Sequence, residues 1–346
     1  MTPVVRHLLI GGYGPPRGEG SGITLVEHDR SAGTLRVAGT AIATRSPSAL
    51  AVSADGRTVF AVEEQDAGAV HSFRWDGGAR LTVTSSQASG GMDPCHLLVH
   101  PSGRWLLAAN YSGATVSAHP ISADGALGPQ LAVVRFTGGG PNPDRQEAPH
   151  PHMVAVVPGT AELAIADLGG DCVRRVGFDA RDGTFGPELP PVALPAGFGP
   201  RQVVFAADGR TAYVLGELNG HLAAVAWDGG QPQVISTQLA AGRPLPPGNT
   251  AAALELSPDG RRLYASHRGA DVIAAFDLAD PRQPRWERSW PAGGRSPRHV
   301  ARDGAWLYAA CEASGIIAAH HVDRGTVTTV AVPSPTFVLP VGPADR

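Results

Sequence analysis

The feature that most limits the fold of this chain is a short phrase that recurs six times along it. The phrase is an apolar segment, a turn of the type Ser/Ala-x-Asp-Gly-Arg and a second apolar segment, as in SALAVSADGRTVFAVEE and RQVVFAADGRTAYVLGE. The turn glycines, or the residues aligned with them, are Gly56, Gly103, Gly159, Gly209, Gly260 and Gly304. They are 47, 56, 50, 51 and 44 residues apart, which is the length of a β-propeller blade.

The segments after each phrase supply two further strands, so each repeat is predicted to form a four-stranded antiparallel sheet. VRRVGFDARDG followed by TFGPELPPV is one such pair, with Asp-Gly at the bend. Near the N-terminus, HLLIGGYG, GITLVEHDRSAG and TLRVAGTAIA fit the last three strands of a blade, and the C-terminal PSPTFVLPVG can supply its first. We therefore predict an all-β, seven-bladed β-propeller that forms a single domain over residues 1–346. Pairing of the terminal strands would close the ring.

Charge and cysteine use exclude several kinds of partner. The net charge of -3, with 17% charged residues, argues against a nucleic-acid-binding surface. The three cysteines are far apart and lack CxxC spacing, so neither a disulfide framework nor a thiolate zinc site is predicted. No run reaches the roughly 18 apolar residues of a membrane span, and the N-terminal apolar stretch is too short for a signal-peptide core. We expect a cytoplasmic protein, a monomer or a weak homodimer, that binds neither nucleic acid nor membrane.

Polar residues are predicted to gather at one end of the central channel, where the first strand of each blade starts and the second ends. Seven residues before the turn glycines stand Ala49, His96, His152, Gln202 and Ala253, with His299 joining if the sixth copy is one residue shorter. Seven and eight residues after them stand Glu63 and Glu64, Asn110 and Tyr111, Ala166 and Asp167, Gly216 and Glu217, His267 and Arg268, and Cys311 and Glu312. Because the midpoints of the same strands are apolar, this pattern favours a binding site. A structural polar channel filled by water is the alternative.

Arginines and histidines define the predicted site further. Four arginines stand close to the inner strands: Arg145, Arg201, Arg268 and Arg298. The guanidinium fork binds carboxylates and phosphates bidentately, so the cluster predicts an anion site. Ordinary ion pairs with Glu63, Glu217 or Glu312 are the alternative. His150 and His152 alternate in HPH, but without a third ligand in the sequence they do not predict a metal site. The chain has no GxSxG or GxxxxGK[ST] motif, and we expect no cofactor.

Several segments, in collinear order, resemble the lactonase-type seven-bladed propeller family. They include PCHLLVHPSGRWLLAANYSGATVSAHPI, RQEAPHPHMVAV, GPRQVVFAADGRTAYVLGEL and NTAAALELSPDGRRLYASHRG. That family includes bacterial 6-phosphogluconolactonases and fungal carboxymuconate lactonising enzymes. In its lactonising members a His, an Arg and a Glu are implicated in catalysis, and their motifs match His152, Arg201 and Glu217. The chain departs from the common family pattern at Gln202, Gly216, Ala253 and His267.

The resemblance and the predicted site imply a metal-independent lactone hydrolase of carbohydrate metabolism. Its expected substrate is a small anionic sugar lactone, as for a 6-phosphogluconolactonase of the pentose phosphate pathway. In this interpretation Glu217 is the general base on water, His152 protonates the leaving alkoxide and Arg201 stabilises the oxyanion. Substrate binding is assigned to His96, Asn110, Tyr111, Arg145, Gln146, His150, Arg268 and Arg298. A muconate-type lactonising enzyme running the reverse chemistry and a non-catalytic ligand-binding or scaffold propeller are the alternatives.

Overall fold

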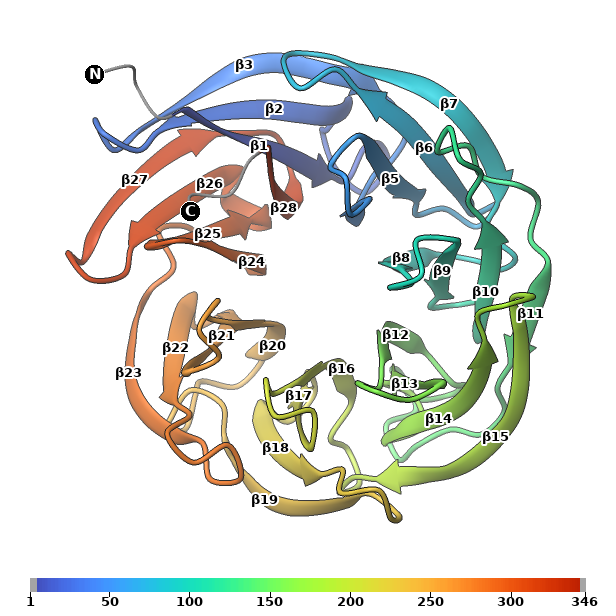
Figure 1. The fold of residues 1–346 in the computed structure, drawn as a ribbon. Coiled ribbons are helices and arrows are strands. Elements are labelled where there is room, and N and C mark those ends of the chain that lie inside the picture. The colour runs from blue at the N-terminus through green and yellow to red at the C-terminus, as the bar shows by residue number, and fades with distance from the viewer. Residues whose placement is uncertain (1–4, 343–346) are drawn as a thin grey trace.

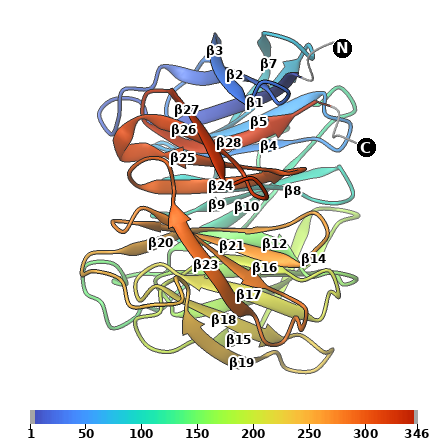
Figure 2. The same ribbon diagram turned by 90° about the vertical axis from the view of Figure 1, so that its left-hand side faces the viewer.

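Seven four-stranded antiparallel sheets form a ring in this protein, as the computed structural model shows for residues 5–342 (Figure 1). Seen edge-on, the ring is a disk (Figure 2). In six sheets the strands follow sequence order, and the seventh has the order β28-β1-β2-β3. The predicted all-β, seven-bladed propeller is thus confirmed.

The blades are numbered here from the ring-closing sheet. Blades 1 to 3 comprise β28 (Pro335–Val341), β1 (Val5–Gly12), β2 (Gly22–Asp29) and β3 (Thr34–Ala43); β4 (Leu50–Val52), β5 (Thr58–Glu63), β6 (Ala69–Trp75) and β7 (Leu81–Ala88); and β8 (Pro94–Val99), β9 (Trp105–Asn110), β10 (Thr115–Pro120) and β11 (Ala132–Arg135). Blades 4 and 5 comprise β12 (Pro151–Val156), β13 (Glu162–Asp167), β14 (Cys172–Asp179) and β15 (Thr184–Ala193); and β16 (Pro200–Phe205), β17 (Thr211–Gly216), β18 (His221–Ala226) and β19 (Gln233–Leu239). Blades 6 and 7 comprise β20 (Thr250–Leu256), β21 (Arg262–Arg268), β22 (Val272–Asp277) and β23 (Arg285–Pro291); and β24 (Pro297–Asp303), β25 (Trp306–Cys311), β26 (Ile316–His321) and β27 (Thr326–Ala331). A short 3-10 helix, η1 (Glu312–Ser314), follows β25.

The Asp-Gly turns explain why the repeated phrase folds into a hairpin. At the first copy the backbone of Gly56 has a φ of 72°, a left-handed conformation that glycine adopts without steric cost. The Asp55 carboxylate accepts a hydrogen bond from the backbone N–H of Arg57 at 3.0 Å. The same arrangement recurs at Gly209, with a φ of 65°, beside Asp208. Each such turn joins the first two strands of a blade.

The hydrophobic core is divided among the interfaces between neighbouring blades, each of which holds a cluster of buried side chains. Between blades 3 and 4, for example, Trp105 and Val116 pack with Ile165 and Phe178. The second strands contribute most because both of their faces are covered, as in the fully buried WLLAAN of β9. The channel ends of the inner strands are therefore free to carry polar side chains.

Closure of the ring joins the two ends of the described chain. Strand β1 pairs with β28, with Leu9 opposite Leu339 and Ile10 opposite Val338. The blue and red strands lie side by side in Figure 1. The prediction that PSPTFVLPVG supplies the missing first strand is confirmed, and the pairing leaves no open sheet edge at the seam.

Candidate active site

An extra residue near the start of the inner strand directs side chains into the channel. In blades 3, 4, 5 and 7 this strand begins with a proline that pairs with the last residue of the second strand. The residue after this proline has no pairing partner on the second strand, and the pairing resumes one residue later. In the four blades this residue is Cys95, His152, Arg201 and Arg298. Proline is tolerated at the first residue of a strand or at a bulge, and a β-bulge re-aims the side chain that it carries. We call this place the bulge position.

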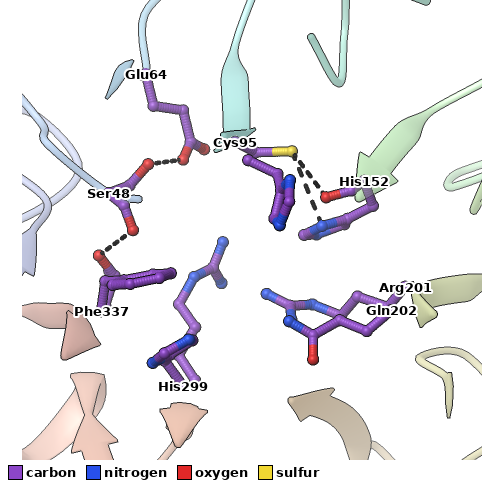
Figure 3. Close-up of a pocket in the computed structure, with 11 residues that line it drawn as sticks. Ser48, Glu64, Cys95, His152, Arg201, Gln202, His299 and Phe337 are labelled. Carbon is purple, nitrogen blue, oxygen red and sulfur yellow. Dashed lines mark hydrogen bonds between the residues drawn. The ribbon is translucent and has the colours of Figure 1, made fainter. Parts of the chain in front are cut away.

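All four of these side chains line one pocket in the channel (Figure 3). Its lining comes from six of the seven blades: Ser48, Glu64, Cys95, His96, His152, Arg201, Gln202, Arg298, His299, Thr336 and Phe337. At the corresponding place in blade 6 the inner strand carries the small, buried residues Ala252 and Ala253. The predicted convergence of polar groups at one end of the channel is present.

A repeated backbone contact fixes a second set of side chains beside this pocket. The residue after the second strand donates its N–H to a carbonyl just ahead of the inner strand. Glu217 donates to Gly199 at 2.7 Å, and Glu64 donates to Ser46 at 3.1 Å. Both acceptor residues have left-handed backbones, with φ of 61° and 38°. The same contact positions Tyr13, Tyr111, Leu168 and Glu312. We call the five members other than the apolar Leu168 the rim residues: Tyr13, Glu64, Tyr111, Glu217 and Glu312.

Glu217 lies among three arginines from three parts of the chain. Arg145 donates from Nη2 to Glu217 Oε1 at 2.7 Å. Arg201 Nε and Arg268 Nη2 lie 2.8 and 3.0 Å from Oε2. These arginines belong to the loop before β12, to β16 and to β21. The predicted arginine cluster exists, and the alternative of ion pairing with Glu217 holds for these three members.

The charges around Glu217 control its protonation. Burial alone raises the pKa of this carboxyl group, but the positive charges of Arg268, Arg201 and Arg145 together outweigh burial. They hold the pKa of Glu217 well below its usual value. The carboxylate is therefore ionised at neutral pH and is a weak base.

His152 has the opposite character. Burial, followed by the positive charge of Arg201, lowers the pKa of His152 well below its usual value, so the imidazole is neutral at pH 7. Its Nδ1 lies 3.8 Å from Sγ of Cys95, and its ring packs edge-on against Tyr111. Burial and the charge of Arg268 lower the pKa of Arg201 to about 10, which leaves this guanidinium positively charged at neutral pH. A neutral imidazole and a cation thus line the same wall of the pocket (Figure 3).

An aromatic pair completes the mouth beside Arg145. The ring of His150 stacks on Tyr111, with centroids 4.2 Å apart and planes 7° apart. Arg145 Nη2 lies 3.3 Å from the Tyr111 hydroxyl, and His150 Nε2 lies 3.1 Å from Glu147 Oε1. These three predicted binding residues lie together next to the Glu217 cluster.

The fourth predicted arginine has other partners. Arg298 Nη2 donates to the hydroxyl of Tyr13 at 2.7 Å, and its Nη1 lies 3.6 Å from Glu312 Oε2. His96 also reaches the pocket, where its Nδ1 accepts a long hydrogen bond, 3.4 Å, from the backbone N–H of Val154 in the next blade. Burial lowers the pKa of His96 to about 4.

Two predicted substrate-binding residues point away from the pocket, which corrects their assignment. Asn110 is fully buried inside blade 3, where its Nδ2 donates to Thr115 Oγ1 at 3.0 Å. Gln146 is also buried and donates from Nε2 to the carbonyl of Leu168 and to Asp171 Oδ1 at 2.9 and 2.7 Å. Asn110 is the last residue of β9 and pairs with Thr115 of β10, and Gln146 holds its loop against blade 4. Both side chains stabilise the fold around the site.

The strand register in the third copy of the phrase, which forms blade 4, also needs a correction. In other copies the N–H that closes the turn belongs to the glycine, but here it belongs to Thr160. Strand positions in this copy must therefore be counted from Thr160, one residue after Gly159. His152 consequently occupies the bulge position, in phase with Arg201, and is not in phase with His96 as the count predicted. The correction brings His152 and Arg201 into equivalent places in neighbouring blades.

Five pocket and rim residues lay outside the rings predicted from the sequence: Tyr13, Ser48, Cys95, Thr336 and Phe337. A second repeated signal would have found most of them. A proline stands directly before the bulge position in six repeats: Pro47-Ser48, Pro94-Cys95, Pro151-His152, Pro200-Arg201, Pro297-Arg298 and Pro335-Thr336.

Within residues 5–342, no three His, Cys, Asp or Glu side chains are arranged to hold a metal ion. In the same range no helix has the length and apolar character needed to cross a membrane.

Comparison with known proteins agrees with this architecture. Residues 7–340 match the family described as "Lactonase, 7-bladed beta-propeller". A 6-phosphogluconolactonase of Bacillus subtilis is 27% identical over 98% of each chain. A periplasmic gluconolactonase of Pseudomonas aeruginosa superposes with a TM-score of 0.86 at 29% identity, over 98% of this chain and 99% of that one. A Lactobacillus plantarum protein superposes with a TM-score of 0.89 at 27% identity, over 98% of this chain and all of that one. The chain therefore belongs to the lactonase family of seven-bladed β-propellers.

Proposed function

We propose that this protein hydrolyses a small anionic sugar lactone, in the manner of a 6-phosphogluconolactonase. The observation that carries the proposal is the pairing of a neutral imidazole, His152, with the positively charged Arg201 on one wall of the channel pocket. A neutral base and a fixed cation are what ester-bond hydrolysis needs. The B. subtilis and P. aeruginosa relatives, named for this kind of chemistry, support the same proposal.

In the proposed mechanism, His152 accepts a proton from a water molecule, whose oxygen attacks the lactone carbonyl carbon. Arg201 donates hydrogen bonds to the oxyanion of the tetrahedral intermediate. When the intermediate collapses, the ring C–O bond breaks and His152 returns its proton to the departing alkoxide oxygen. The product is an open-chain hydroxy acid, which releases its acidic proton to solvent.

Glu217 has a different role in this mechanism from the one predicted from the sequence. A carboxylate whose two oxygens are already paired with three arginines is poorly placed to accept a proton from water. We therefore assign proton transfer to His152 and assign Glu217 to holding Arg201 in place. The general-base role of Glu217 stays a prediction that the variants below test against this one.

The same cluster supports an anionic substrate. Three arginines and one carboxylate carry a net positive charge, and Arg145, whose side chain is 39% exposed, is open to solvent. A phosphate or carboxylate near Arg145 and Arg268 would bind to N–H groups that Glu217 leaves free. The pentose phosphate pathway and a cytoplasmic location remain predictions, and the P. aeruginosa relative is named as periplasmic.

The test is hydrolysis of 6-phosphogluconolactone and of simple lactones by wild-type protein and by His152→Ala, Arg201→Ala and Glu217→Gln variants. Loss of the base or of the oxyanion donor should lower kcat by about 100-fold or more. Arg262→Ala is the matched control, because Arg262, at the start of β21, forms an exposed ion pair with Glu287 of the outer strand β23 at 3.0 Å. Unchanged rates in all three site variants would refute this site.

The two alternatives give different results in the same assay. A lactonising enzyme would form a lactone from a muconate-type acid faster than it opens one, using the same residues in reverse. A binding propeller would hold a sugar acid at the arginines without turnover.

A further inference from the structure

The two walls of the channel pocket differ in chemistry. Figure 3 shows Glu64 and Ser48 on one side of the space, with His152 and Arg201 on the other. The His152 wall provides a neutral imidazole and a cation. The opposite wall provides a carboxylate and a hydroxyl group, which the proposed mechanism does not use.

Glu64 is held in a defined orientation by three donors. Its Oε1 accepts hydrogen bonds from the Tyr13 hydroxyl at 2.8 Å and from Arg17 Nη1 at 2.9 Å. Its Oε2 accepts a hydrogen bond from Ser48 Oγ. A carboxylate has about four acceptor positions, two on each oxygen. Oε2 therefore keeps one acceptor position for a ligand in the pocket that Glu64 lines.

Arg298 supplies donors next to this acceptor. It lines the same pocket and donates from Nη2 to Tyr13, whose hydroxyl in turn donates to Glu64. Burial, and to a smaller degree the charge on Glu64, raises the pKa of Tyr13, so its hydroxyl stays protonated and the chain of hydrogen bonds persists at neutral pH. A ligand group that both donates and accepts, as an alcohol hydroxyl does, fits between Glu64 and Arg298.

An anionic group does not fit beside Glu64, because a carboxylate or phosphate would face another negative charge there. The three arginines around Glu217 attract such a group instead. The site is thus asymmetric. Cations exceed the single carboxylate around Glu217, whereas the cations Arg17 and Arg298 beside Glu64 are matched by the acidic groups Glu64, Asp93 and Glu312.

We infer that Glu64, supported by Ser48 and Tyr13, is a hydroxyl-binding subsite that makes the protein selective for polyhydroxylated lactones. It would orient the substrate with its hydroxyl groups toward Glu64 and its anionic group toward the arginines. The inference rests on the proposed function and adds to it the residue that selects for the hydroxyl groups of the substrate. The competing explanation is that Glu64 only anchors Arg17 and Tyr13.

The experiment compares δ-gluconolactone with δ-valerolactone, which has the same ring size and no hydroxyl groups. The measured quantity is the ratio of kcat/KM for the two lactones, in wild-type protein and in Glu64→Gln. A hydrogen bond to a charged partner contributes about 1.5–3 kcal/mol, so Glu64→Gln should lower the ratio by about tenfold or more. Glu63→Gln is the matched control, since this neighbouring carboxylate pairs with His71 at 3.1 Å and is outside the pocket lining. It should leave the ratio unchanged.

The outcomes separate this inference from the proposed function. A folded Glu64→Gln variant with an unchanged ratio would overturn the inference while leaving the lactonase in place. If Glu64→Gln does not fold, Ser48→Ala is measured in the same way, and a ratio that stays within about twofold of wild type counts against the subsite. If wild-type protein opens neither of these lactones nor 6-phosphogluconolactone, the proposed function fails. Calorimetric binding of gluconate against 5-hydroxyvalerate then tests the subsite alone, and equal affinities would refute it.

Discussion

Blades 2 and 5 build the same pair of positions and fill it with different chemistry. In each blade a rim glutamate, Glu64 or Glu217, lies next to the residue that follows the proline of the inner segment, Ser48 or Arg201. The same backbone contact fixes both glutamates. In blade 5 the partner is a cation, and two more arginines join it. In blade 2 the partners are hydroxyl groups and the partly exposed Arg17.

This difference shows how a repeat can make an asymmetric site without changing its backbone. The seven blades repeat one geometry, so the channel end is a ring of equivalent places. The side chain at each place then decides whether it attracts an anion or accepts a hydrogen bond. Glu217, with arginine at this place and two further arginines beside it, is a counter-ion, whereas Glu64, with serine at the same place, keeps an acceptor position for a ligand.

The largest expected effect comes from removing the charge of Glu217. Glu217→Gln leaves the buried guanidinium of Arg201 without its partner, and breaking a buried ion pair costs about 3–5 kcal/mol of unfolding free energy. Because the pKa of Glu217 is lowered, wild-type protein keeps this stabilisation above the ordinary carboxyl range and loses it as the pH falls below that range. Denaturant unfolding at pH 7 measures the cost. Glu64→Gln should cost less than half as much, since hydroxyl donors can bond to an amide oxygen. Equal costs would show that the two clusters are electrostatically alike.

The next largest effect should appear in the pH dependence of wild-type kcat/KM. His152 is neutral over a wider range than an ordinary histidine, so kcat/KM should stay level from about pH 8 down to about pH 6.5, where an ordinary histidine is half protonated. On the alkaline side, activity should fall near the Arg201 pKa of about 10. Glu64→Gln should leave both limbs in place because it acts on the other wall. An acid midpoint near 6.5 would contradict the neutral-base role of His152.

Substitution of Asp171 should have a smaller effect on kcat/KM. This residue positions groups on the Glu217 side of the site only. Its carboxylate accepts hydrogen bonds from Gln146 at 2.7 Å and from the backbone of Gly199 at 2.8 Å, whose carbonyl holds Glu217. Asp171→Ala should loosen the Arg145 loop and this turn together, and lower kcat/KM by about 10- to 100-fold. Asp171→Asn, which keeps one acceptor, should recover part of the loss. A variant whose loss appears only in melting temperature would show that Asp171 supports the fold and not the site.

Removal of the Arg17 side chain should have the smallest effect, which is on the free energy of unfolding. Its side chain is 39% exposed, although its partners Glu64 and Asp93 are buried. Solvent screens such a pair, so Arg17→Ala should lower the free energy of unfolding by about 1 kcal/mol or less, and less at high salt. Urea unfolding at low and high salt measures it. A tenfold loss of lactonase activity in this variant would mean that Arg17 itself binds substrate, and the acceptor side would then need a cation as well.

Much of the fold was predictable from the sequence, because local chemistry specifies it. Asp55 and Gly56 make a turn with their own backbone and side chains, and apolar strands of matching length flank that turn in each repeat. The spacing of the repeats then predicts the number of blades. The three N-terminal strands lack the first strand of a blade, which predicts that a C-terminal strand pairs with them. These inferences needed no knowledge of distant contacts.

The site was predictable as a place but only partly as a set of contacts. Arg145, Arg201, Arg268 and Glu217 were all identified, yet the sequence does not say that one carboxylate receives all three cations. Asn110 was placed in the site because a count cannot tell a side chain that enters the channel from one that enters the blade. The extra residue at each bulge changes that direction, and pairing between strands decides where the bulge falls.

The sequence by itself therefore determined the repeat, the turn chemistry, the closure of the ring and the end of the channel where polar groups gather. Only the tertiary structure decided that His152 shares the bulge position with Arg201, that Glu217 is surrounded by arginines and that Glu64 keeps a free acceptor. The physical reason is the distance along the sequence between the residues that interact. Turns and strands depend on neighbouring residues, whereas the charge and hydrogen bonding of a channel side chain depend on blades that are about 50 or more residues away in sequence.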